Sequence, residues 1–177
     1  LMPLVSECLD AAGVTPEDLD QLIVGVGPGP FTGLRVGVVT AQILSAVLDL
    51  PLRGVCSLDV LAAQFAGAHP GGFVVATDAR RREVYWAAYT SAGVRIGDPR
   101  VSRPSDAPRL PTIGPAADLY TDQLDPVPGP RSLDPGVLAT CGLTLPEAGQ
   151  EPLYLRHPDA REITRPKSVL HYQGVRR

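Results

Sequence analysis

Cysteine is scarce in this sequence, and its scarcity excludes two kinds of covalent stabilisation. The 177-residue chain has 3 cysteines. Cys8, Cys56 and Cys141 are far apart, odd in number and free of any CxxC spacing. Disulfide frameworks and zinc knuckles need paired or closely spaced cysteines, so we expect neither. A reducing compartment fits this pattern, and we predict a cytoplasmic protein.

The sequence also lacks a secretory signal and a long apolar run. Its first residues do not combine positive charge with a following apolar core, which is the pattern of a signal peptide. The longest apolar stretch, Val36 to Leu48, is shorter than the roughly 20 residues that a membrane span requires. We therefore predict no contact with a membrane.

Basic charge is in short supply. Lysine and arginine total 16 against 19 acidic residues, which gives a net charge of −3 and an isoelectric point of about 5.6. Phosphate contacts dominate the affinity of nucleic-acid-binding proteins, so a free-standing binder normally carries a basic excess. Work on RNA would have to depend on a partner's charge, and we expect tRNA contact to be indirect only.

The groups that usually carry catalysis are missing as well. His69, His157 and His171 are not within metal-ligand spacing of one another, and no HxxxH or HExxH pattern occurs. No serine lies in a G-x-S-x-G elbow. We therefore predict no catalytic residue, no metal site and no cofactor.

Two polar features near residue 80 leave alternatives open. Asp78 follows a predicted strand and could bind a metal or a hydroxyl, but an aspartate at a turn more often accepts hydrogen bonds from nearby backbone N–H groups. The run Arg80-Arg81-Arg82 could touch RNA or phosphate, although a solvated hairpin tip is the favoured interpretation.

The spacing of apolar residues nevertheless predicts a folded α/β chain. The first third alternates predicted helices and short strands: a helix at 1–12 ending at Gly13, a turn at 16–19, a strand at 22–27, a helix at 31–48, a strand at 51–55, and a helix capped by Ser57 and running to about Phe65. The middle predicts strands at 73–77 and 83–90, the second apolar on both faces, then antiparallel pairing through 94–96 and 100–102.

The last part of the chain has a different texture. Thirteen of the 19 prolines fall between Pro99 and Pro166. We expect loops there, with short elements near 112–113, 134–141 and 153–155, and an irregular tail from His157. The whole pattern predicts two lobes that join near Gly67–Gly72: residues 1–67 form the N-terminal lobe and residues 68–177 form a proline-rich C-terminal lobe.

A glycine-rich corner precedes the longest predicted helix. Gly27 to Gly37 reads GPGPFTGLRVG, and a glycine-rich turn before a helix can cradle an anion. However, Pro28 and Pro30 remove two backbone donors, and no lysine follows as in a Walker-type loop. We favour a tight strand-to-helix corner over a phosphate site.

The helix that follows carries a continuous ridge of small side chains at every fourth position: Gly33, Gly37, Ala41 and Ser45. Rows of this spacing interlock when helices pack, so another helix can approach closely. Leu34, Val38 and Leu48 lie to one side of the ridge, and Val36, Val39, Ile43 and Val47 lie to another. Such a helix needs partners on two sides. Core packing within the chain and docking of a second protein both remain open.

Three stretches resemble the bacterial TsaB family, also called YeaZ: VGPGPFTGLRVGVVTAQILSAVLDLPLRGVCSLDVLAA (26–63), ATDARRREVYWAAY (76–89) and PLYLRHPDA (152–160). The resemblance implies the two-lobed fold of the actin, hexokinase and Hsp70 group, with the first lobe missing its N-terminal hairpin in this chain. This chain departs from the family pattern at two points. Without the hairpin the sheet of the first lobe is incomplete, so nucleotide binding is not expected, and Arg82 stands where the family has a small residue.

The same resemblance implies a function. The catalytic relative TsaD carries two metal-binding histidines where this chain has Ser57 and Leu61, so this member is expected to be a non-catalytic partner. It is implied to bind and activate TsaD in the synthesis of tRNA N6-threonylcarbamoyladenosine through its first two helices, with the TsaE ATPase as a further partner. The interface residues expected here are Leu4, Cys8, Phe31, Gly33, Leu34, Gly37, Val38, Ala41 and Ser45. The alternatives are a glycoprotease-like, metal-dependent enzyme and a homodimer that uses the same helices.

Overall fold

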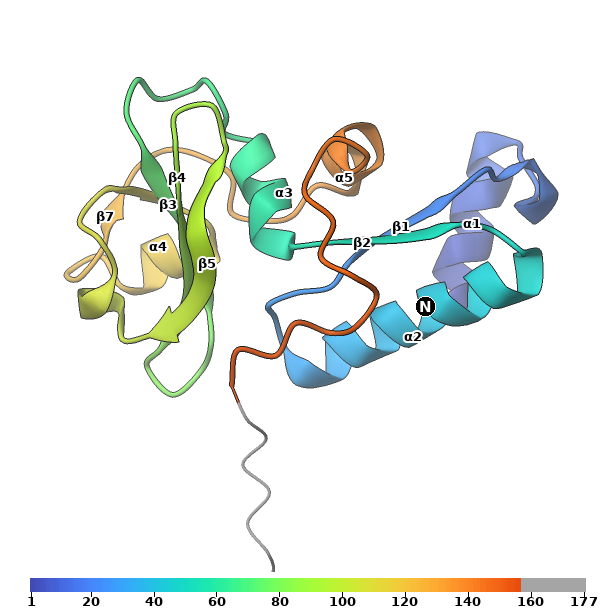
Figure 1. Cartoon of the computed structure of the whole chain (residues 1–177), viewed down its shortest axis with the longest axis horizontal. Helices are drawn as coiled ribbons and strands as arrows, with labels where there is room; N and C mark the ends of the chain where they lie inside the picture. Colours follow the sequence, from blue (N-terminus) through green and yellow to red (C-terminus); the bar gives the residue numbers. More distant parts are fainter. Residues whose placement is uncertain (157–177) are drawn as a thin grey trace, which may run out of the picture.

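The computed structural model describes residues 1–156 and contains two separate β-sheets. The smaller sheet pairs β1 (Leu22–Gly25) in parallel with β2 (Leu52–Val55). The larger has the order β5-β4-β3-β6-β7, with β3 antiparallel to β4 and parallel to β6 (Figure 1). Its strands are β3 (Phe73–Asp78), β4 (Val84–Tyr89), β5 (Arg95–Ser102), β6 (Pro111–Ile113) and β7 (Asp125–Pro126). The predicted α/β class is confirmed.

Five α-helices accompany these sheets in the described part of the chain: α1 (Met2–Ala12), α2 (Phe31–Leu48), α3 (Ser57–Ala63), α4 (Pro115–Leu119) and α5 (Pro135–Cys141). Residues Pro16–Asp18 and Pro104–Asp106 form 3-10 turns. Helix α1 ends at Gly13, whose φ of 69° gives the left-handed cap that glycine adopts most cheaply. Helix α2 covers the predicted range and begins directly after Pro30.

Strand β4 is covered on both faces, as its sequence predicts. Ala87 and Tyr89 belong to one core cluster, together with Leu58 and Leu61 of α3. Val84 and Trp86 belong to a second cluster on the opposite face, together with Ala116 of α4. The five-stranded sheet therefore lies between two helical layers (Figure 1).

Helix α3 follows β2 in sequence but packs on the larger sheet. Leu58 and Leu61 are buried in the same cluster as Phe73 of β3 and Tyr89 of β4. The predicted lobe boundary after residue 67 stays a prediction. In the structure, residues 57–63 pack with the sheet that comes after that boundary.

Some predicted local features are wrong. Cys56, not Ser57, is the N-cap of α3, and the Ser57 hydroxyl instead accepts a hydrogen bond from the backbone N–H of Gly27 at 3.1 Å. Residues 153–155, where a short element was expected, form neither helix nor strand, although the backbone N–H of Leu153 donates to the carbonyl of Val26 at 2.7 Å. The predicted tail from His157 lies outside the described residues.

Helix α2 bears on the prediction of no membrane contact. Within residues 1–156 it alone is long and apolar enough, by length and composition, to cross a membrane. Core helices of water-soluble proteins also meet that criterion, but they are mostly buried, whereas 6% of α2 is buried within the chain. The inner side of α2 rests on β1 and β2, and the amide of Gln42 donates to the carbonyl of Gln150 at 2.9 Å. An open two-stranded sheet cannot enter lipid without leaving backbone groups unpaired.

Candidate functional site

Helix α2 has one side that faces its own sheet. Val38 is fully buried, and Leu34 packs over Gly27, the first residue of the glycine-rich corner. Both residues were predicted to belong to a partner interface. No partner can reach the side chain of Val38, because the chain's own β-sheet already covers it.

The other side of α2 is apolar and exposed. Its large side chains have exposed fractions between 46% and 75%: Phe31, Val36, Val39, Ile43 and Val47. Four of these were assigned from the sequence to a flank of the helix without being named as interface residues. Exposed branched side chains in a row along one helix are uncommon on a water-facing surface and are typical of interaction sites.

The glycine ridge lies open beside this row. An added Cβ at Gly33 or Gly37 would meet nothing within 4 Å. Farther along, Ala41 and Ser45 are half-buried, and the Ser45 hydroxyl donates to the carbonyl of Leu50 at 2.6 Å. The first half of the ridge is thus free for another helix, whereas the hydroxyl of Ser45 is already bonded to the backbone just beyond the C-terminus of α2. We call the exposed side chains and Gly33 and Gly37 together the α2 face.

Helix α1 is even less covered than α2. None of its residues is buried, and Leu4 is 59% exposed. Cys8 is also exposed, whereas Val5 and Leu9 are half-buried. The two predicted interface residues on this helix are therefore accessible. Figure 1 places α1 and α2 at the same end of the molecule, away from the five-stranded sheet.

The start of α2 is tied to the C-terminal part of the described chain. The Arg35 guanidinium lies 4.4 Å from the centre of the Phe31 ring, and its Nε donates to the Tyr154 hydroxyl at 2.9 Å. The rings of Phe31 and Tyr154 are 5.2 Å apart. Phe31, although 46% exposed, is thus already half of an aromatic pair within the chain.

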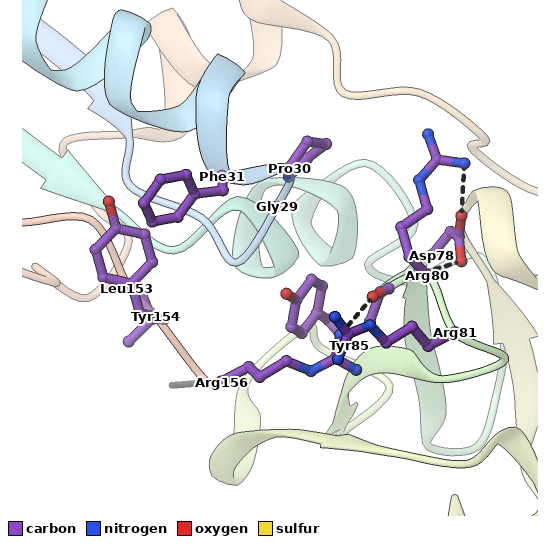
Figure 2. Close-up of a pocket in the computed structure, with 11 residues that line it drawn as sticks. Gly29, Pro30, Phe31, Asp78, Arg80, Arg81, Tyr85, Leu153, Tyr154 and Arg156 are labelled. Atoms are coloured by element: carbon purple, nitrogen blue, oxygen red, sulfur yellow. Dashed lines mark hydrogen bonds and ion pairs between the residues drawn. The ribbon is translucent and has the colours of Figure 1, made fainter. Parts of the chain in front are cut away.

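A cavity of about 410 Å³ separates this aromatic pair from the five-stranded sheet. Figure 2 shows Pro30 and Phe31 on one wall and Asp78, Arg80 and Tyr85 on the other. The glycine-rich corner therefore forms a wall of the cavity. The cavity is lined by three segments that are far apart in sequence, residues 29–31, 78–85 and 153–156, and no sequence pattern indicated that they meet.

The turn after β3 contains both polar features whose roles the sequence left open near residue 80. The Asp78 carboxylate accepts a hydrogen bond from the backbone N–H of Arg80 at 2.9 Å and forms an ion pair with its side chain at 3.5 Å. Local backbone contact, which the sequence favoured, is therefore what the structure shows for this aspartate. Arg80, Arg81 and Arg82 form the exposed tip of the β3–β4 hairpin.

The resemblance aligns Ser57 and Leu61 with two histidines of TsaD. Leu61 is buried, with 3% of its surface exposed, whereas Ser57 is half-buried and its hydroxyl accepts a hydrogen bond from the backbone N–H of Gly27. Within the described residues, no three His, Cys, Asp or Glu side chains come together where a metal ion would need them.

The chain matches a protein family and several relatives. The family model described as "TsaD: tRNA N6-adenosine threonylcarbamoyltransferase" matches residues 1–127. An uncharacterized protein of Mycobacterium tuberculosis (strain ATCC 25618 / H37Rv) is 40% identical over 166 residues, which is 92% of this chain and 76% of that protein. The tRNA threonylcarbamoyladenosine biosynthesis protein TsaB of Bacillus subtilis is 42% identical over 89 residues, which is 50% of this chain and 38% of that protein.

Solved structures agree with these sequence matches. YeaZ from Pseudomonas aeruginosa superposes with a TM-score of 0.70 at 26% identity, covering 88% of this chain and 83% of that one. The TsaB protein of Escherichia coli is 41% identical over 91 residues, half of this chain and 39% of its own length. The chain therefore belongs to the family that the TsaD model describes and, within it, to the TsaB (YeaZ) group.

Proposed function

We propose that this chain is a non-catalytic scaffold subunit that binds and activates a TsaD-type transferase in the synthesis of tRNA N6-threonylcarbamoyladenosine. The names of its relatives support a part in that synthesis. The observation that carries the scaffold role is the exposed, glycine-lined α2 face. We also propose that the chain has the two-lobed fold of the actin, hexokinase and Hsp70 group, which the resemblance implies.

Burial of the α2 face would provide much of the binding energy. Full burial of a valine or isoleucine side chain contributes about 1.5–3 kcal/mol. Val36, Val39, Ile43 and Val47 are each about half exposed or more. Covering all four would release on the order of several kcal/mol before the entropic cost of association. Gly33 and Gly37 would let the partner's helix come close enough to reach them.

A protein fits this face better than a lipid bilayer does. Only one side of α2 is free, and the other side is bound to β1, β2 and the segment near Gln150. Because the free side is a single stripe with a seam of small residues, its shape matches another helix. A second copy of this chain could use the same stripe, so self-association competes with TsaD binding. A TsaE-like ATPase stays a predicted partner, and no surface of this chain is assigned to it.

The matched pair Ile43→Asp and Ile96→Asp tests the proposal. Ile43 lies on the α2 face and is 57% exposed, whereas Ile96 lies on edge strand β5 and is 56% exposed. Each change adds a negative charge at an equally exposed isoleucine. In co-purification with the TsaD-type subunit, we expect Ile43→Asp to lose the partner and Ile96→Asp to keep it.

Both variants should be checked for folding by circular dichroism before the pull-down is interpreted. If Ile43→Asp is folded and still co-purifies like the wild type, the α2 face is not the docking surface. If neither the wild type nor Ile96→Asp retains a TsaD-type subunit, the scaffold role itself is wrong. Sedimentation of each protein alone reports the homodimer separately.

A further inference from the structure

Arginines gather at one end of the five-stranded sheet. Arg80, Arg81 and Arg82 form the β3–β4 turn. Strand pairing of Val84 with Ser102 and of Trp86 with Arg100 brings the end of β5, with Arg103 just beyond it, beside that turn. Arg156 joins them, because its Nη1 donates to the carbonyl of Ala79 at 3.3 Å. We call these six residues the arginine end.

The local charge at this end is opposite to that of the whole chain. Residues 78–83 and 100–106 together with Arg156 hold six arginines against Asp78, Glu83 and Asp106, a local charge of +3 in a chain of −3. Asp78 pairs with Arg80 and Glu83 pairs with Arg156. The Arg80 side chain is still 85% exposed. A concentrated positive potential therefore faces solvent here despite the acidic composition.

The three arginines of the β3–β4 turn share a strained backbone conformation. Arg80, Arg81 and Arg82 have φ values of 60°, 55° and 60°. Residues with a Cβ rarely adopt this left-handed region, and three in a row would be most cheaply built from glycine. Strained backbone of this kind is commonly found at ligand-binding sites.

Aromatic rings accompany the arginines. The Arg100 guanidinium lies 5.8 Å from the centre of the Trp86 ring. Tyr85, Phe31 and Tyr154 line the cavity that Arg80, Arg81 and Arg156 also line (Figure 2). Single-stranded RNA is bound by this combination, because phosphates pair with arginine while unstacked bases lie on aromatic or guanidinium planes.

We propose that the arginine end contacts the phosphates of an unpaired segment of tRNA while the chain is bound to its partner. That the RNA is a tRNA rests on the proposed function. The contact is direct, so it departs from the expectation of indirect contact, which was drawn from net charge alone. Net charge averages over the molecule and misses six arginines brought together by strand pairing.

The test compares Arg82→Gln with Arg109→Gln, and adds the triple change of Arg80, Arg81 and Arg82 to Gln. Arg109 is also exposed but lies at the other end of the sheet. It precedes β6, which begins beside the N-terminal end of β3, whereas the arginine turn follows the C-terminal end of β3. Fluorescence anisotropy follows binding of a labelled tRNA transcript to the complex of this chain with the TsaD-type subunit, over a series of salt concentrations.

We expect Arg82→Gln to weaken tRNA binding and to lower the salt slope by about 1, and the triple change to lower it by about 2 to 3. Arg109→Gln should leave both unchanged. Equal binding and an equal salt slope for the triple variant and the wild type would overturn the proposal. So would a triple variant that loses the TsaD-type subunit, because the arginine end would then be a surface for an acidic protein.

The two proposals fail separately. Size-exclusion chromatography reports whether the complex forms at all, which tests the scaffold role. If it does not form, ultraviolet crosslinking of the chain alone to the transcript at low salt repeats the comparison. A crosslink at residues 80–82 that the triple change removes would still support the arginine end, and its absence would overturn it.

Discussion

Asp59 is a charged residue that the core has to accommodate. It is 2% exposed, and the Tyr89 hydroxyl donates to it at 2.8 Å while Arg95 Nη1 donates to both carboxylate oxygens at 3.0 and 2.8 Å. Burial raises the pKa of the Asp59 carboxyl, whereas the bonds from Tyr89 and Arg95 lower it. The arrangement links α3 to β4 and β5 through buried hydrogen bonds, which a buried charge requires.

Arg95→Met should destabilise the protein by about 3–5 kcal/mol near neutral pH, because it leaves a buried carboxylate without its cation. The pKa of Asp59 would then rise further. Between the unfolded pKa of aspartate and this raised value, the folded chain holds a proton that the unfolded chain has lost. Stability therefore falls as the pH rises, and the loss should be larger at about pH 8 than at about pH 5. Urea unfolding at both pH values measures it.

Arg100→Met serves as the control for that measurement. Arg100 is exposed on the same strand, so its loss should cost less than about 1 kcal/mol at either pH. If Arg95→Met were no more costly than Arg100→Met, or if its cost did not grow with pH, the Asp59–Arg95 pair would not hold the helix to the sheet.

The same residues show a limit of sequence reasoning. Asp59, Tyr89 and Arg95 lie in three separate elements, and nothing in their spacing announces that they meet. Local polar contacts were easier to anticipate. Asp78 accepts a hydrogen bond from the backbone N–H of Arg80, as the sequence favoured, and Thr15 donates its own N–H to Asp18 at 2.8 Å in the turn expected there. Contacts over two or three residues follow from turn chemistry, whereas contacts across strands depend on register.

At the scale of elements, α2 was predictable in its limits but not in its orientation. The prolines before Phe31 and the apolar run up to Leu48 determine where the helix begins and ends. The helix is apolar around most of its circumference, so periodicity could not tell its inner side from its outer side. The structure places Val38 inside and Ile43 outside. The short helix α4 was missed because prolines dominate its surroundings.

Gly37→Leu separates the stability of α2 from its role in binding. A Cβ added at Gly37 would meet nothing within 4 Å in the isolated chain. Replacing a helical glycine with a better helix former should therefore leave the free energy of unfolding unchanged or raise it by about 0.5–1 kcal/mol. The same side chain would overpack a close helix contact by about 1–3 kcal/mol or more. Thermal unfolding and a titration with the TsaD-type subunit measure the two effects.

Gly54→Ala, in strand β2 beneath α2, provides the contrast. A Cβ at Gly54 would lie 1.8 Å from the Gly149 carbonyl oxygen, so this change should destabilise the fold. A Gly37→Leu variant that behaved like Gly54→Ala, with lower stability in the isolated chain, would mean that the ridge is packed internally and is no docking seam.

At the scale of the whole molecule, the sequence indicated the α/β class and left open whether α2 packs within the chain or against a second protein. It could not indicate the cavity, because residues near 30, 80 and 155 line it together. It also could not indicate the arginine end, which depends on how β4 pairs with β5. Both features arise from contacts between segments that are remote in sequence, and helical or strand periodicity carries no information about such contacts.

Whether α1 and α2 act as one surface can be tested through the cysteines. Cys8 is exposed on α1, while Cys56 is 1% exposed and burial raises its pKa to about 11. Iodoacetamide should therefore modify Cys8 quickly in the isolated chain and leave Cys56 almost untouched, since the thiolate is the reactive form.

Binding of the TsaD-type subunit should slow the reaction at Cys8 about tenfold or more if α1 is covered together with α2. At a free partner concentration about ten times the Kd, only about one chain in eleven is unbound, and only the unbound chains would react. Mass spectrometry of each peptide gives the rates, with Cys141 as a half-buried reference outside both helices. Equal rates at Cys8 with and without the partner would confine the interface to α2. If the reaction at Cys8 instead slows when the isolated chain is concentrated, the surface belongs to a homodimer.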